Sequence, residues 1–225
     1  IYAMFVSWIR NHRGGSFWLL AAIFLWGCLP AACFSLVAQA TLDYPLAAAF
    51  HVTGFPFHLT PYVVTAPLTE ELFKGMAVFA VFTARRREFD GPFDGVIYGT
   101  MVGLGFAVIE NLLYYLDTDA FVLVVRTYAF GLSHAFFTSL TGIGFGIASH
   151  ALNAFERYAA PLIGLAGAML AHALHNLIVW LSIEEPSMFW LAVAADWAGV
   201  AFVILVMSLA VVRARRERPV PPDGL

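Results

Sequence analysis

Long apolar runs, separated by short stretches that hold most of the charge, extend along nearly the whole chain. Each run is about 20 residues long or longer, which is the length that an α-helix needs to cross the roughly 30 Å hydrocarbon layer of a membrane. Strands of an ordinary sheet are much shorter. The pattern therefore predicts an all-α polytopic membrane protein with about six transmembrane helices, at residues 17–40, 61–83, 93–116, 121–148, 161–183 and 189–212.

A further apolar stretch, residues 44–58, does not fit this pattern. It contains Pro45, Gly54 and Pro56, which disfavour a regular helix. We interpret it as an interfacial or re-entrant segment, with a short additional span as the alternative.

The sequence shows no internal repeat or linker that would divide the chain. Residues 1–212 are therefore expected to form one transmembrane domain, with a motif-bearing core at 61–183. The charged, proline-rich residues 213–225 are expected to form a disordered cytoplasmic tail.

Basic residues alternate with acidic residues from one loop to the next. Of the twelve Lys and Arg, only Lys74 and Arg126 lie outside four stretches that flank the predicted spans, namely Arg10 and Arg13, then Arg85, Arg86 and Arg87, then Arg157, and finally Arg213, Arg215, Arg216 and Arg218. Lys and Arg in short loops are retained on the cytoplasmic side. The alternation predicts a multi-pass protein of the cell membrane with both termini in the cytoplasm.

The composition agrees with a membrane protein, since 61% of residues are hydrophobic, 12% are charged and the mean hydropathy is +0.80. The net charge of -3 leaves no basic face for nucleic acid, so nucleic-acid binding is not expected and the lipid bilayer is the expected surrounding. Cys28 and Cys33 both lie in the first span, where we interpret them as small apolar residues.

Ionisable residues inside the predicted spans are the main indication of function, because each costs on the order of 3 kcal/mol to insert. Six of them stand out, namely Glu70, Glu71 and Lys74 in the second span, Glu110 in the third, His134 in the fourth and His172 in the fifth. At about 1.5 Å per residue, all four helices bring these groups near the midplane or into the outer half. One isolated histidine would be explained by a polar contact between helices, but four helices at similar depth favour a single buried site.

The spacing within the second span favours proton-transfer chemistry. Glu70 and Lys74 are four residues apart and share a helix face, so the amine can offset part of the carboxylate charge. Glu71 is turned by about 100° and approaches from another angle. Two adjacent carboxylates cannot both be ionised cheaply in a low dielectric, so one of them is suited to exchange a proton.

Each of the two histidines has a polar residue one helical turn later. His134 is followed by Thr138, and His172 is followed by Asn176. Each of these partners is expected to orient its histidine or to bind substrate.

Glycines line one face of the third span and one face of the fourth. They are Gly95, Gly99, Gly103 and Gly105, and then Gly142, Gly144 and Gly146. Close packing of helices is the simpler interpretation of these faces. A route for substrate entry is the alternative.

Five short motifs in order resemble those of the PrsW family of intramembrane proteases. The first, Glu70-Glu71-Leu72-Phe73-Lys74, is similar to E-E-x-x-K. It is followed by Phe93-Asp94-Gly95-Val96-Ile97-Tyr98-Gly99, by Gly105-Phe106-Ala107-Val108-Ile109-Glu110-Asn111, by His134 with Thr138, and by His172 with Asn176. Each motif alone is weak, but their order on successive spans is specific.

The resemblance implies an intramembrane endopeptidase that cuts a single-span membrane protein, such as an anti-sigma factor, on the extracytoplasmic side. The expected catalytic residues are Glu70, Glu71, Glu110, His134 and His172, and the expected supporting residues are Lys74, Asn111, Thr138, His175 and Asn176. The related type II CAAX prenyl endopeptidases usually carry an arginine after the glutamate pair and a histidine at the place of Glu110. Lys74 and Glu110 therefore favour the PrsW family. His175 departs from the family pattern, where an aromatic residue is frequent, and is either a packed ring or a further ligand.

Our hypothesis for the mechanism is hydrolysis in which Glu70 or Glu71 activates a water molecule while the histidines position it or stabilise the oxyanion. Whether a metal takes part stays open, since the H-E-x-x-H motif is absent. Two histidines and a carboxylate from separate helices would still form a zinc site, with His134, His172, Glu71 and Glu110 as candidate ligands.

Three other functions remain as alternatives. The same polar residues would suit a non-catalytic membrane scaffold, a type II CAAX-like prenyl peptidase or a proton-coupled transporter. The transporter is the weakest, because no internal repeat is present. The sequence leaves the substrate and the oligomeric state open.

Overall fold

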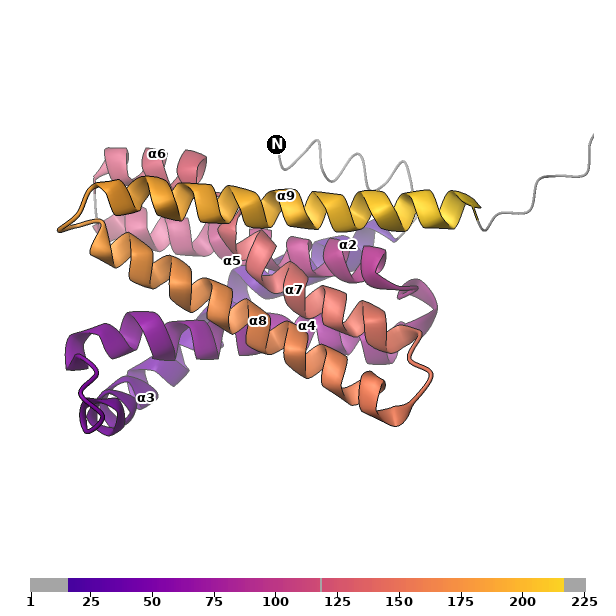
Figure 1. Cartoon of the computed structure of the whole chain (residues 1–225), viewed down its shortest axis with the longest axis horizontal. Coiled ribbons are helices and arrows are strands. Elements are labelled where there is room, and N and C mark those ends of the chain that lie inside the picture. The colour runs from indigo at the N-terminus through magenta and orange to yellow at the C-terminus, as the bar shows by residue number, and fades with distance from the viewer. Residues whose placement is uncertain (1–15, 118, 217–225) are drawn as a thin grey trace, which may run out of the picture.

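The computed structural model describes residues 16–117 and 119–216, which are mostly helical and contain no β-strand. The helices are α2 (Phe17–Trp26), α3 (Ala32–His51), α4 (Ala66–Ala84), α5 (Pro92–Asp117), α6 (Ala120–Ala129), α7 (Ser133–Ser149), α8 (Ala154–Leu181) and α9 (Ser187–Arg216). Two π-helical turns, η1 (Gly27–Ala31) and η3 (Pro61–Thr65), and two 3₁₀ turns, η2 (Phe57–Leu59) and η4 (Arg86–Glu88), complete the described elements. In Figure 1, α9 extends along one edge of the bundle, α8 crosses it at an angle, and α3 projects on the opposite side.

Five segments of the described chain are long and apolar enough to cross a membrane. They are Phe17–His51, Pro92–Leu116, Ala120–Ser149, Ala154–Leu181 and Ser187–Leu209. The prediction of an all-helical, multi-pass membrane protein is confirmed. The count of six spans and the cytoplasmic position of both termini stay predictions.

The second predicted span is helical from η3 to the end of α4, but it is not among the five segments. Its middle holds Glu70, Glu71 and Lys74, so it is more polar than the other long helices. These three side chains are buried inside the protein, where lipid does not reach them.

The predicted interfacial segment begins later than expected. The first helical stretch continues through η1 and α3 to His51, so Pro45 lies inside a helix. Proline is tolerated in membrane helices when the freed backbone group finds another partner. The helix ends where Gly54 adopts a φ of +89°, and the amide of Phe55 then bonds to the carbonyl of Phe50. This is the glycine-terminated end common in helices.

The fourth predicted span is broken into α6 and α7. Gly131 lies in the break, where the amide of Ser133 donates to the carbonyl of Phe130 at 3.0 Å and the hydroxyl oxygen of Ser133 lies 2.8 Å from the same carbonyl oxygen. His134 is therefore the second residue of α7. The depth estimate for this histidine assumed one straight helix, so it does not hold.

The boundaries of α8 and α9 differ less from the predicted spans. α8 begins at Ala154 rather than at 161, because the side chain of Asn153 caps it by accepting from the amide of Glu156 at 2.8 Å. α9 reaches Arg216, so the first residues of the predicted tail are helical. Residues 217–225 of that tail, together with Arg10 and Arg13, lie outside the described residues. The single-domain assignment stays a prediction.

Helices α5 and α7 pack against each other through their backbones, as the close-packing interpretation of the glycines predicts. A Cβ atom built on Gly95 would overlap the carbonyl of Gly142, and one built on Gly103 would overlap the carbonyl of His134. The two helices lie side by side in the middle of the bundle (Figure 1). This close approach fixes the start of α7, which carries a histidine of the site described next.

Candidate active site

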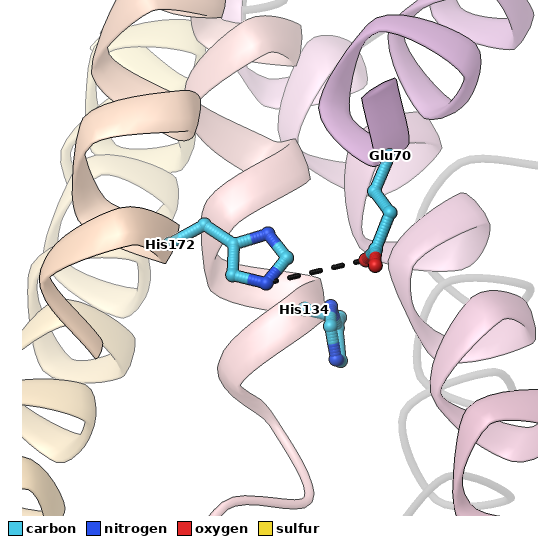
Figure 2. Close-up of side chains that lie close together, drawn as sticks. All are labelled: Glu70, His134 and His172. Atoms are coloured by element: carbon cyan, nitrogen blue, oxygen red, sulfur yellow. Dashed lines mark ion pairs between the residues drawn. The ribbon is translucent and has the colours of Figure 1, made fainter. Parts of the chain in front are cut away.

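Three helices bring Glu70, His134 and His172 to one place. Glu70 comes from α4, His134 from α7 and His172 from α8, and all three are buried. One nitrogen or carboxylate oxygen from each lies within 4.8 Å of the corresponding atoms of the other two. Figure 2 shows the three side chains directed towards a common space.

Glu71 holds the centre of the hydrogen-bond network. Its Oε1 atom lies 2.6 Å from the ammonium of Lys74 and 3.0 Å from Nδ1 of His172. Its Oε2 atom accepts from the hydroxyl of Thr138 at 3.1 Å, so Thr138 contacts this carboxylate rather than the histidine one turn before it. Because a carboxylate can only accept, Nδ1 of His172 carries the proton and Nε2 is left as an acceptor.

Glu70 presents a carboxylate oxygen without a hydrogen-bond donor from any described residue. Its Oε1 atom accepts from the side-chain amide of Gln39 at 3.3 Å. Its Oε2 atom is buried without a hydrogen-bond partner, and it lies 3.5 Å from Nζ of Lys74 and 4.0 Å from Nε2 of His172. Two acceptors therefore face each other. Hydrogen bonds of about 2.8 Å allow one water molecule to bridge such a gap.

Glu110 forms the more accessible side of the site. Its Oε2 atom lies 2.6 Å from Nε2 of His134 and 2.6 Å from Nη2 of Arg126. The other ring nitrogen of His134 is 3.2 Å from Nζ of Lys74. Asn111 accepts from Nε of Arg126 at 3.1 Å. The side chains of Glu110 and Arg126 are 20% and 22% exposed, so the site opens on this side.

The side-chain amide of Asn176 is not directed at His172, so the orienting role is not seen, and substrate binding by Asn176 stays a prediction. Its side-chain amide donates to the carbonyl of Tyr62 at 2.8 Å. Tyr62 lies in the π-helical turn η3, where each carbonyl accepts from the amide five residues later. That residue is Pro67, which has no amide hydrogen. Asn176 supplies the missing donor and so fastens α8 to the turn that leads into α4.

His175 lies beside the three-residue site and is not part of it. Its ring contacts those of Phe130 and Phe137, with centroids 4.9 and 5.7 Å apart. Nδ1 lies 2.9 Å from a carboxylate oxygen of Asp196 in α9, although it is not aligned for a hydrogen bond. This placement favours the packed ring over the further ligand.

Three residues near the site had no assigned role in the sequence interpretation. Gln39 contacts Glu70, Arg126 contacts Glu110, and Asp196 contacts residues next to both histidines. Two of them carried a signal. Arg126 was one of the two basic residues outside the predicted cytoplasmic stretches, and Asp196 is the ionisable residue of the last span. Gln39 carried none, because an uncharged amide is not unusual in a membrane helix.

The charges of the site are nearly balanced. Three carboxylates, on Glu70, Glu71 and Glu110, face two cations, Lys74 and Arg126. Neutral histidines leave the set with one negative charge in excess. Glu71 and Glu110, which the sequence offered as metal ligands, are both engaged by cations.

The donor set of Glu70, His134 and His172 suits a zinc ion. Two imidazoles and one carboxylate with an open fourth position are the ligands of many catalytic zinc sites. Ligand bonds of about 2.0–2.1 Å place neighbouring donor atoms about 3.4 Å apart, and the three atoms here lie within 4.8 Å of one another. Small side-chain rotations would close this difference. The cost is the nearby Lys74 ammonium, which would have to turn away from His134.

A family model described as PrsW family intramembrane metalloprotease matches residues 15–212. The chain is 30% identical over 193 residues to Protease PrsW of Geobacillus kaustophilus, covering 84% of this chain and 75% of that protein. It is 30% identical over 149 residues to Protease PrsW of Oceanobacillus iheyensis, covering 66% and 63%, and 27% identical over 143 residues to that of Shouchella clausii, covering 64% and 58%. No solved structure matches the chain.

Proposed function

The chain belongs to the PrsW family of intramembrane proteases, and from this premise we propose that it hydrolyses a peptide bond of a membrane-anchored protein with Glu70 as the general base. The observation that carries the proposal is the pair of facing acceptors, Oε2 of Glu70 and Nε2 of His172, 4.0 Å apart. Water has two hydrogens and satisfies both atoms at once. It is thereby held beside the carboxylate that takes its proton.

The reaction then proceeds by attack of this water on the scissile carbonyl carbon. As the carbon–oxygen bond forms, the proton passes to Oε2 of Glu70. Negative charge develops on the carbonyl oxygen. Arg126, on the accessible side of the site, and the buried ring of His134, which shares Glu110 with it, are proposed to stabilise this charge. The carbon–nitrogen bond breaks when Glu70 returns the proton to the leaving amine.

Glu71 is an orienting residue in this mechanism. Both of its carboxylate oxygens are engaged by protein groups, so neither is free to take a proton from water. Its contact with Nδ1 of His172 directs Nε2 of that ring towards Glu70. Lys74 offsets the charge of both glutamates.

The proposed substrate is a single-span membrane protein, such as an anti-sigma factor. Removing the proton acceptor in vivo, with Glu70→Gln at the native locus, is expected to leave such a protein uncut. Comparative proteomics of membrane fractions from parent and variant cells would detect its accumulation. Identical membrane proteomes would contradict the proposal. A scaffold function would also predict identical membrane proteomes, because a scaffold does not depend on a proton transfer.

Glu70, His134 and His172 are the residues that would hold a zinc ion in this site. When bound, zinc polarises a carbonyl oxygen and makes a coordinated water more acidic. Every other step described above belongs to residues of the chain. Glu70 and His172 would then bind the ion instead of contacting the water directly, so the metal analysis also decides how these two residues act.

Elemental analysis of the purified protein tests the metal. We expect about one zinc ion per chain in the parent and a loss of most of it in His172→Ala, since one of three protein ligands is removed. His150→Ala is the matched control, because this histidine is exposed and pairs with Asp90 at 2.9 Å. A metal-free preparation that cleaves at the full rate would remove zinc from the mechanism and leave Glu70 and His172 acting on water.

A further inference from the structure

A second buried polar cluster, formed by Ser133, His175 and Asp196, lies beside the site and takes no part in the reaction proposed above. Asp196 belongs to α9 and is 5% exposed. The hydroxyl of Ser133 donates to its Oδ2 atom, and Nδ1 of His175 lies 2.9 Å from the same oxygen. One carboxylate thus joins α9 to α7 and to α8.

Placing the carboxylate of Asp196 inside this apolar helix carries a free-energy cost. It is the ionisable residue in the apolar segment Ser187–Leu209, and a carboxylate in a membrane helix costs on the order of 3 kcal/mol. Such residues persist where they face the protein interior and serve a function.

Packing alone already holds α9 in the bundle. Val203 and Met207 are buried in the main hydrophobic core. Phe136 of α7 lies directly against Gly199, where a Cβ atom would overlap its ring. Attachment of α9 therefore does not explain the carboxylate.

Two members of the cluster lie close in sequence to the two histidines of the site, on the same helices. Ser133 is the first residue of α7 and directly precedes His134, so the carboxylate also lies at the positive end of that helix. His175 is one turn after His172 on α8. The ring of Phe137 stacks on His172 at 5.0 Å between centroids and also contacts His175 at 5.7 Å. Asp196 therefore contacts Ser133, which precedes His134, and His175, which lies one turn after His172.

We propose that Asp196 is a positioning residue for hydrolysis, which holds the first turn of α7 and the middle of α8 so that His134 and His172 keep their places around Glu70. This inference rests on the proposed function of the site. Displacement of a catalytic group by about 1 Å costs on the order of a hundredfold in rate. Asp196 acts on the rate through geometry, and substrate binding is left largely unchanged.

The test compares Asp196→Ala with Asp196→Asn in proteoliposomes, with a fluorophore-tagged copy of the single-span protein that accumulates in the Glu70→Gln strain as the substrate. Alanine removes the carboxylate that contacts both Ser133 and His175, and we expect kcat to fall by about ten- to a hundredfold with KM within about threefold. Asparagine keeps an oxygen at the same place, so it should restore kcat to within about threefold of the parent. Asp196→Ala should also shift the ring resonances of His134 and His172 in histidine-labelled NMR spectra.

Met207→Ala is the matched control for a general loosening of α9. Met207 is buried on the same helix and has no polar contact with the site. This variant should lower the melting temperature while kcat stays within about twofold of the parent. The inference is overturned if Asp196→Ala cleaves as fast as the parent, if Asp196→Asn loses as much as alanine, or if Met207→Ala reproduces the loss of kcat.

Failure of this inference can be told apart from failure of the proposed function. Glu70→Gln is measured in the same assay. If this variant cleaves as fast as the parent, the proposed function fails. If it is inactive and Asp196→Ala is fully active, only the positioning role of Asp196 fails.

Discussion

Glu70→Gln is expected to lower the cleavage rate by about a hundredfold to ten-thousandfold, the range for loss of a general base. Glutamine keeps the shape of the side chain but cannot take a proton from water. The loss should appear in kcat, and the melting temperature should change little, because Oε2 of Glu70 makes no hydrogen bond with a described residue and Lys74 keeps its closer ion pair with Glu71. Cleavage kinetics in proteoliposomes and thermal unfolding in detergent measure the two effects.

Two further glutamate variants serve as a comparison and a control for Glu70→Gln. Glu71→Gln should slow cleavage less, by about ten- to a hundredfold, since it disturbs the orientation of His172 without removing the base. It should lower the melting temperature, because Lys74 loses its closest anion. Glu184→Gln, an exposed glutamate between α8 and α9, should change neither quantity. A larger kinetic loss in Glu71→Gln than in Glu70→Gln would exchange the roles of the two glutamates.

Gly103→Ala is expected to impair both stability and catalysis. The added Cβ atom would lie 2.6 Å from the carbonyl carbon of His134 and 2.8 Å from the Cα atom of Ala135. Both are backbone atoms, so α5 and α7 must move apart, and overpacking of this kind costs about 1–3 kcal/mol. His134 moves with α7, so a loss of about a hundredfold in rate is expected as well. Thermal unfolding and cleavage rates provide the measurement.

Gly75→Ala is the matched control, because it makes the same chemical change in the helix that carries Glu70. Its Cβ atom would meet only side-chain carbons, those of Thr141 at 3.4 Å and Leu165 at 3.5 Å. Such contacts are ordinary, and alanine is favoured over glycine in a helix by up to about 1 kcal/mol. This variant should be as stable as the parent or more so. Equal behaviour of the two variants would show that the contact between α5 and α7 is not tight.

The sequence predicted the helical class and the residues that gather at the site. Hydropathy defines long helices well, because a bilayer imposes their length. Buried charge is equally informative, since a residue such as Lys74 is retained in a membrane only at a cost. Glu70, Glu71, Glu110, His134 and His172 were named from this cost together with the family resemblance, and the structure brings them within reach of one another.

The contacts between those residues could not be predicted in the same way. Helical spacing suggested partners within one helix for Thr138 and Asn176, whereas both bond to other helices. The bond of Asn176 depends on a π-helical turn and a proline, a combination that hydropathy does not detect. The break before His134 depends on local hydrogen bonds of Ser133, which the apolar run conceals. Tertiary geometry decided each case.

The distance along the chain between the partners of the site has a consequence for biogenesis. Glu71 and His172 are separated by 101 residues, and a membrane protein emerges from the ribosome in chain order. While α8 is still in the exit tunnel, the nascent protein holds its glutamates but lacks half of the imidazoles that they need. Because the proposed catalytic set is completed late in synthesis, we expect the nascent chain to be unable to cut other membrane proteins until α8 has been inserted.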